Sequence, residues 1–206
     1  MPCIIPPYIL LDGAVTSGNC VSACDKNTTW HHQNHPLLLE LFERHGKDLC
    51  FAGVVLSDEP VRLEAKEASA QKALKLVMTL APDGVIISKE GFGNPDADQM
   101  MLIRSLEKAG IRTTSITDEF AGVDGSSQSL ADVTKEADAM ISVGNANARL
   151  VLPPMARILG PISDLTSLAG AYPQSLRPDG SLEIELQGII GSTNEFGMQT
   201  LCCREV

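Results

Sequence analysis

The middle of the chain alternates short apolar runs with amphipathic stretches, and this rhythm restricts the possible folds more than any other feature of the sequence. Four runs are rich in β-branched or apolar residues, as is typical of strands buried on both faces: 51–56, 84–88, 113–117 and 139–143. The stretches between them carry apolar residues at helical spacing, with charges opposite: 64–80, 96–109 and 130–137. Strand, helix and strand in quick succession predict an α/β fold with a mostly parallel sheet flanked by helices.

The two ends of the chain differ from this middle. We expect an N-terminal arm with a strand over 8–11 and a helix over 37–45. After residue 151 the sequence becomes proline-rich and irregular, and the alternating residues of 181–190 predict an edge strand or a subunit contact. A chain of 206 residues is long enough for one sizeable core, so we expect a single α/β domain over 1–206.

The charge balance and the apolar runs exclude two classes of partner. The chain has 16 basic and 26 acidic side chains, a net charge of −10, and no basic cluster, which argues against nucleic acid. No apolar run reaches the roughly 18 residues that cross a bilayer, and the first basic residue, Lys26, comes too late for a signal peptide. We therefore predict a cytoplasmic protein without a membrane segment. In that reducing compartment the six cysteines are expected to be buried, reactive or metal-bound rather than bridged.

Polar and small residues gather where three of the expected strands end. Ligands of open α/β sheets bind beyond the carboxyl ends of the strands, because the loops converge there. Ordinary turn chemistry explains any one of these loops, whereas three on one rim favour a pocket for a small polar molecule. The candidate pocket residues are Glu90, Asn94, Asp118, Glu119, Asn145 and Asn147. Neither of the common glycine-rich nucleotide motifs is present, so nucleotide binding has no support.

A segment with two cysteines and three of the four histidines leaves several interpretations open. In the first, Cys20 and Cys24 bind zinc together with histidines. The Cys-x3-Cys spacing is not accompanied by a second cysteine pair, so we predict no metal site. A cysteine nucleophile activated by a histidine is the second. In the third, the cysteines are buried and the histidines solvated, with no chemical role.

The fourth interpretation is peptide-bond chemistry between Asn19 and Cys20. A thiol can attack the carbonyl carbon of the preceding residue and convert the amide to a thioester, if the local backbone is strained and the oxyanion is stabilised. Elimination across Cα and Cβ of Cys20 then splits the chain and leaves a dehydroalanine, which hydrolyses to a pyruvoyl group. Gly18 precedes the pair and allows an unusual backbone conformation.

Four motifs together point to a known family. They are DGAVTSGNCVSACDKN at 12–27, GVIISKEGFGNPDAD at 84–98, TDEFAGVDGSSQSLAD at 117–132 and GNAN at 144–147. The sequence resembles the C-terminal half of the precursor of the alpha and beta subunits of component B of the glycine/sarcosine/betaine reductase complex, from about residue 12 to beyond residue 191. The resemblance implies a cut between Asn19 and Cys20, so that 1–19 is a remnant and 20–206 is the pyruvoyl-type subunit. Cys20 then becomes the pyruvoyl cofactor that forms a Schiff base with the substrate.

The resemblance also implies a reaction and partners. A selenoprotein subunit of component B, other components of the reductase complex and an N-terminal (beta) portion absent from this chain are the expected partners. The small amino-acid substrate loses its amino group by reductive deamination, and the motifs do not indicate which of glycine, sarcosine or betaine is used. The alternative is a non-catalytic subunit that binds a small ligand or serves in assembly, unprocessed at Cys20. Cys24, the Cys202-Cys203 pair and the histidine cluster have no assigned role.

Overall fold

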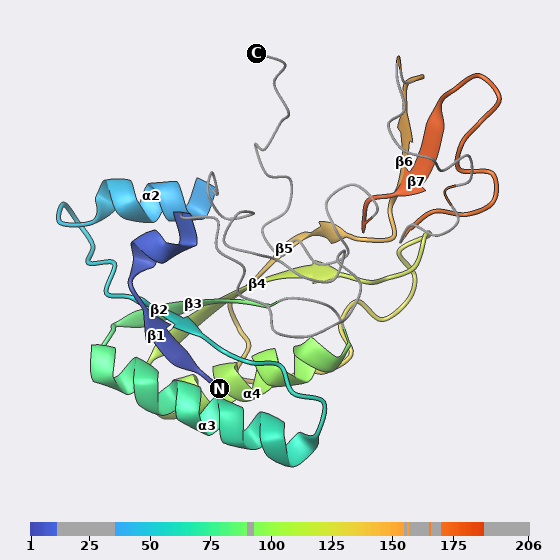
Figure 1. Cartoon of the computed structure of the whole chain (residues 1–206). Helices are drawn as coiled ribbons and strands as arrows, with labels where there is room; N and C mark the ends of the chain where they lie inside the picture. The colour runs from blue at the N-terminus through green and yellow to red at the C-terminus, as the bar shows by residue number, and fades with distance from the viewer. Residues whose placement is uncertain (12–35, 90–92, 155, 157–164, 166–169, 188–206) are drawn as a thin grey trace.

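A three-stranded parallel sheet with two helices forms the centre of the molecule. The computed structural model describes residues 1–11, 36–89, 93–154, 156, 165 and 170–187. The sheet has the order β3-β4-β5, formed by β3 (Gly84–Ser88), β4 (Arg112–Glu119) and β5 (Met140–Asn145). The helices α3 (Leu63–Leu80) and α4 (Asn94–Lys108) pack against each other and lie on the same side of the sheet (Figure 1). The expected α/β fold with a parallel sheet and flanking helices is therefore confirmed.

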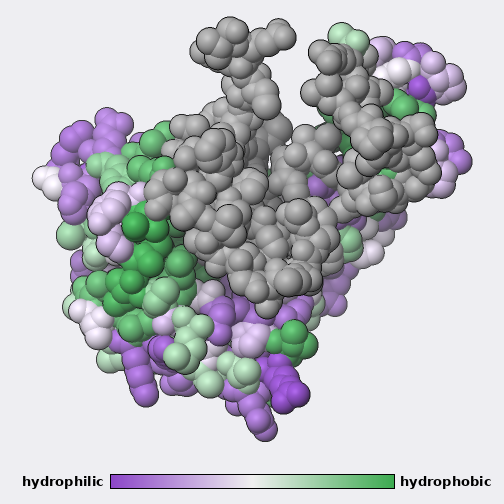
Figure 2. Space-filling model, in the orientation of Figure 1, coloured by the Kyte–Doolittle hydropathy of each residue, from purple (hydrophilic) through white to green (hydrophobic). Residues whose placement is uncertain are grey.

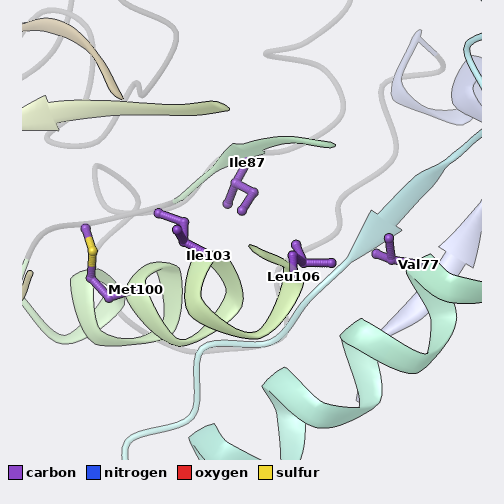
Figure 3. Packing of buried hydrophobic residues seen from close by; sticks show 5 residues of the cluster. All are labelled: Val77, Ile87, Met100, Ile103 and Leu106. Carbon is purple, nitrogen blue, oxygen red and sulfur yellow. The ribbon is translucent and has the colours of Figure 1, made fainter. Parts of the chain in front are cut away.

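The core lies between the sheet and these two helices. Five buried residues form one cluster, and Figure 3 shows their side chains on β3, α3 and α4: Val77, Ile87, Met100, Ile103 and Leu106. Burying an aliphatic or methionine side chain of this size stabilises the fold by about 1.5–3 kcal/mol. The apolar side chains of α4 thus pack against those of β3, as the sequence pattern predicts.

Local sequence explains where the central helices begin and end. Gly93 precedes α4 with φ 78°, a conformation that favours glycine, and Pro95 occupies its first turn. The N–H of Gly93 donates to the Asp96 carboxylate over 3.2 Å, which caps the first turn. At the other end of the preceding helix, Ala81 terminates α3 in the left-handed conformation with φ 47°.

The N-terminal elements correct two expectations. The strand expected over 8–11 is wrong: a 3-10 helix, η1 (Pro7–Leu11), occupies these residues, because Pro7 fixes φ for a helical turn. The strand lies earlier, as β1 (Cys3–Ile5), and pairs antiparallel with β2 (Val54–Leu56) in a separate two-stranded sheet. The run 51–56 is therefore a strand only in its second half, outside the parallel sheet. Hydrophobic side chains gather on the surface over β1 and η1 (Figure 2).

The helix expected over 37–45 is confirmed as α2 (Pro36–Arg44), and the one expected over 130–137 is wrong. Hydrogen bonds to α4 and within the segment hold this connection between β4 and β5 in an irregular path. The N–H of Ala131 donates to the Asp96 carboxylate over 2.7 Å, and that of Ala137 donates to the Thr134 carbonyl over 3.1 Å. The β-branched Val133 and Thr134 also weaken the local helical preference. Ala137 nevertheless packs against the core, as its spacing predicts.

The C-terminal part forms a ribbon outside the parallel sheet. β6 (Arg149–Leu152) pairs antiparallel with β7 (Leu182–Glu185), and the two lie beyond the end of β5 (Figure 1). The strand expected within 181–190 is confirmed over 182–185, and the residues after 187 lie outside the described part. No helix in the described ranges is long and apolar enough to cross a membrane.

Candidate functional site

A buried ion cluster joins the carboxyl ends of β3 and β4 to the start of α4. We call Lys89, Asp96 and Asp118 the strand-end cluster. Lys89 directly follows β3, Asp118 is the penultimate residue of β4, and Asp96 lies in the first turn of α4. The Nζ atom of Lys89 lies 2.8 Å from Oδ1 of Asp96 and 3.2 Å from Oδ1 of Asp118. The three side chains are at most 5% exposed. The cluster lies at the edge of the sheet where ligands of this fold class bind.

The two carboxylates of the cluster differ in how much of their bonding capacity is used. Asp96 accepts hydrogen bonds from the backbone N–H groups of Gly93 and Ala131 at Oδ2, and its Oδ1 faces Lys89. Asp118 has only the Lys89 ammonium at Oδ1, and its buried Oδ2 accepts no hydrogen bond in the described chain. Burial raises the pKa of Asp118 above its ordinary value, and the Lys89 ammonium offsets part of that rise. Within the described residues, Asp118 thus keeps one buried oxygen without a hydrogen-bond donor.

A second buried ion pair lies beside the cluster and connects the two helices. Lys66 of α3 pairs with Asp98 of α4, and its ammonium also donates to the backbone carbonyl of Asn94 over 3.0 Å. Burial raises the pKa of Asp98, and the Lys66 ammonium opposes that shift. The side chain of Asn94 is exposed. Both acceptors of Lys66 belong to α4, so we assign this pair to helix packing.

An amide network holds the loops after β4 and β5 together. The Asn145 side chain accepts from the N–H of Ala121 over 3.2 Å and donates to the carbonyl of Gly122 over 2.7 Å. Asn147 accepts from the N–H of Gly122 over 2.9 Å and donates to Glu185 of β7 over 3.2 Å. These bonds occupy both amides and give the loops next to the strand-end cluster a defined shape.

The last candidate at this rim, Glu119, ties β4 to its neighbours. Its carboxylate accepts a hydrogen bond from the Ser129 hydroxyl over 2.9 Å and another from the Ser142 hydroxyl of β5. Its backbone carbonyl accepts from the N–H of Ala146 over 2.8 Å. Glu119 is therefore engaged within the same network, with its side chain partly buried.

Comparisons with known proteins place the chain in a family. The family described as glycine/sarcosine/betaine reductase component B subunits matches residues 1–204. The chain belongs to this family. The Peptoclostridium acidaminophilum protein named glycine reductase complex component B subunits alpha and beta is 48% identical over 99% of the chain. From the same organism, the sarcosine reductase complex component B subunit alpha is 46% identical over 99% of the chain, and the betaine reductase counterpart is 35% identical over 100%.

This member of the glycine/sarcosine/betaine reductase component B family spans about half the length of those relatives, since each match covers 48% of the relative's own chain. No solved structure matches the chain. The relatives' names identify them as components of reductase complexes.

The structure brings together four of the eight residues that the sequence predicts for the site. Asp118 belongs to the strand-end cluster, and the amide network next to it contains Glu119, Asn145 and Asn147. Asn94 contributes its backbone carbonyl to the Lys66 contact and not its side chain to the cluster. The remaining predicted residues, Asn19, Cys20 and Glu90, lie outside the described part, as do Cys24, Cys202, Cys203 and three histidines.

Neither Lys89 nor Asp96 is among the pocket residues that the sequence predicts. The available signal was a lysine placed directly after a buried strand, where a cation needs acidic partners from the neighbouring loops. Among the residues that the structure describes, no group of three or more histidine, cysteine or acidic side chains is placed to hold a metal ion. The zinc hypothesis involves Cys20 and Cys24, so it falls outside these residues.

Proposed function

We propose that the chain is the pyruvoyl-bearing subunit segment of a glycine, sarcosine or betaine reductase in the cytoplasm. The observation that carries this proposal is the similarity over 99% of the chain to component B subunits of such complexes. The Gly18-Asn19-Cys20 sequence and the buried polar site at the carboxyl ends of the parallel strands support it. The partners we propose are the N-terminal (beta) portion, a selenoprotein subunit of component B and the other components of the complex.

The covalent step that we propose consumes the thiol of Cys20. The sulfur attacks the Asn19 carbonyl carbon, the amide becomes a thioester, and the Cα proton of residue 20 is removed. The Cβ–S bond then breaks, so that the sulfur leaves with the Asn19 carbonyl as a thiocarboxylate and residue 20 becomes dehydroalanine. Addition of water and loss of ammonia give the pyruvoyl group. The cut removes 19 of the 206 residues and leaves 187.

A pyruvoyl carbonyl supplies an electrophile that forms a Schiff base with a primary or secondary amine. Glycine and sarcosine have such an amine, whereas the quaternary nitrogen of betaine has no proton to lose and cannot condense. The residues of this chain that are described would bind and orient the substrate rather than react with it. Asp118 is the best placed of them, because one of its oxygens is unused.

Intact mass spectrometry tests the proposed processing. The chain would be produced together with a polypeptide covering the other half of the relatives, and the expected product is a 187-residue species that a hydrazide reagent labels once. Borohydride in the presence of glycine would fix the amino acid covalently to that species. The Cys20→Ala variant should stay at 206 residues and lose reductase activity.

The matched control is Cys50→Ala, because Cys50 is an exposed free cysteine. It should be cut and labelled like the unmodified chain. An active complex that contains the uncut chain, or activity that survives Cys20→Ala, would refute the proposal and favour the non-catalytic binding or assembly subunit.

A further inference from the structure

Two buried oxygens of the strand-end cluster accept no hydrogen bond from the described residues: Oδ1 of Asp96, which faces the Lys89 ammonium, and Oδ2 of Asp118. Lys89 lies between Oδ1 of Asp96 and Oδ1 of Asp118, and two backbone N–H groups occupy Oδ2 of Asp96. Oδ2 of Asp118 is inaccessible to solvent and accepts no hydrogen bond from the described residues. A buried acceptor without a donor costs free energy of folding, so its persistence indicates a missing partner or a functional role.

Another acceptor without a partner lies on the same helix–strand junction. The Nε2 atom of Gln99 donates to the Ser115 hydroxyl over 2.6 Å and to the backbone carbonyl of Ile116 over 3.3 Å. Because a carbonyl can only accept, this contact fixes the orientation of the amide. Oε1 of Gln99 is therefore the free end, and within the described ranges it accepts no hydrogen bond. The unused oxygens of Gln99 and Asp118 come from α4 and from β4.

The formal charges of the cluster point to a cation as the missing partner. Among the described residues, two carboxylates share one ammonium, so these three side chains together carry a net charge of −1 when ionised, and they are at most 5% exposed. An excess charge in a buried site is costly unless a counter-charge approaches it. A ligand with a positively charged nitrogen supplies that counter-charge, and an N–H group on that nitrogen would satisfy Oδ2 of Asp118.

The relatives are named for glycine, sarcosine and betaine, and these molecules have one feature in common. Each carries a positively charged nitrogen one carbon away from a carboxylate. We propose that Asp118 binds the positively charged nitrogen of the amino-acid substrate, with Lys89 and Asp96 as positioning residues that hold its carboxylate. This inference rests on the proposed function and assigns the substrate-binding residue of that site. It applies also to a quaternary nitrogen, which attracts a carboxylate without donating a proton.

Equilibrium binding to the assembled component B complex tests the assignment. Isothermal titration calorimetry would compare glycine with glycolate, in which a hydroxyl group replaces the ammonium group. The Asp118→Asn variant should lose roughly 30-fold or more in affinity for glycine, the factor expected when one partner of a buried charge pair is removed. Its affinity for glycolate should stay the same. Asp83→Asn is the matched control, because Asp83 is an exposed aspartate before the amino end of β3.

The unfolding temperature separates binding from a structural role. Asp118→Asn leaves Lys89 and Asp96 as a balanced pair, so the variant should unfold at the same temperature as the unmodified complex or a higher one. The assignment is wrong if glycine affinity is unchanged, if glycine and glycolate lose affinity by the same factor, or if the unfolding temperature falls. Should this variant fail to assemble, the Asp118→Glu variant, which keeps the charge but moves it, decides: an unchanged affinity for glycine, or an equal loss for glycine and glycolate, overturns the assignment.

These results also separate the two proposals. A complex that carries the carbonyl and binds glycine equally well with Asp118→Asn refutes only the role of Asp118. An unmodified complex without a carbonyl and without glycine binding refutes the proposed function, and the substrate assignment with it.

Discussion

The buried pair between Lys66 and Asp98 provides a quantitative test of the packing between α3 and α4. The two side chains are 5% and 9% exposed. Removing one partner of such a pair costs about 3–5 kcal/mol, because the other charge stays buried without compensation. The Lys66→Met substitution keeps an unbranched side chain of similar length and removes its charge. It also removes the hydrogen bond to the carbonyl of Asn94. We expect a loss of about 3–5 kcal/mol in the free energy of unfolding at pH 7.

The loss should depend on pH with a definite sign. Burial holds the pKa of Asp98 above its ordinary value, so the native state binds its proton more tightly than the unfolded chain does. Stability from this group is present below the ordinary carboxyl pKa and is lost as the pH rises through the raised native value. The Lys66 ammonium lowers the pKa of Asp98. Removing Lys66 therefore extends to higher pH the range over which protonated Asp98 stabilises the native state. The penalty of Lys66→Met should therefore be smaller at pH 5 than at pH 7.

Urea denaturation followed by circular dichroism measures both effects on the 206-residue chain. Lys75→Met, a matched change at an exposed position of the same helix, should alter the unfolding free energy by about 0.5 kcal/mol or less. Adding Asp98→Leu to Lys66→Met should recover most of the loss, because an apolar pair replaces an isolated charge. A cost below about 1 kcal/mol for Lys66→Met, or an equal cost at the two pH values, would refute the reasoning about this pair.

Three further substitutions test other parts of the fold by the same measurement or by hydrogen exchange. Ala81 ends α3 with φ 47°, so Ala81→Gly should stabilise the protein by about 1 kcal/mol. Ala109→Gly, at φ −83°, should not stabilise it, and equal effects of the two substitutions would contradict this reasoning. Ile103→Ala in the core should lower the free energy of unfolding by about 2–5 kcal/mol. Ile141 on β5 is 52% exposed, so Ile141→Ala should lower it clearly less, and similar losses would show that the core is misplaced. Asn147→Ala should speed amide exchange at 120–129 without changing exchange in α3, and unchanged protection would show that the loop needs no support from this amide.

The central elements could be predicted from the sequence because their patterns are local. The apolar run of β3 and the helical spacing of α3 and α4 directly reflect which side chains are buried. The failure at 130–137 has a different origin, since a bond from Ala131 to Asp96, 35 residues earlier, competes with local helix formation. β6 has only four residues, and its structure depends on pairing with β7, so no local pattern indicates it.

The sequence predicts where the candidate site lies, but only some of the residues that form it. The rule that ligands bind at strand ends identified the loop of Asp118, which the structure places in the buried cluster. The rule does not say which polar residue of a loop points inward. Lys89 and Asp96 are within hydrogen-bonding distance only because β3, α4 and β4 converge, and that convergence is a property of the folded chain.

The ribbon of β6 and β7 is connected to the rest of the molecule in a way that affects how the protein can be shortened. Gln187 donates its backbone N–H to the carbonyl of Ala146, and Glu185 accepts from the Asn147 side chain. A chain that ends before these positions would lose both hydrogen bonds to residues 146 and 147. Asn147 in turn bonds to the loop after β4, so that loop would lose support. Expression tags and truncations in future work should therefore spare the residues up to 187, even though they follow the last parallel strand by some forty positions.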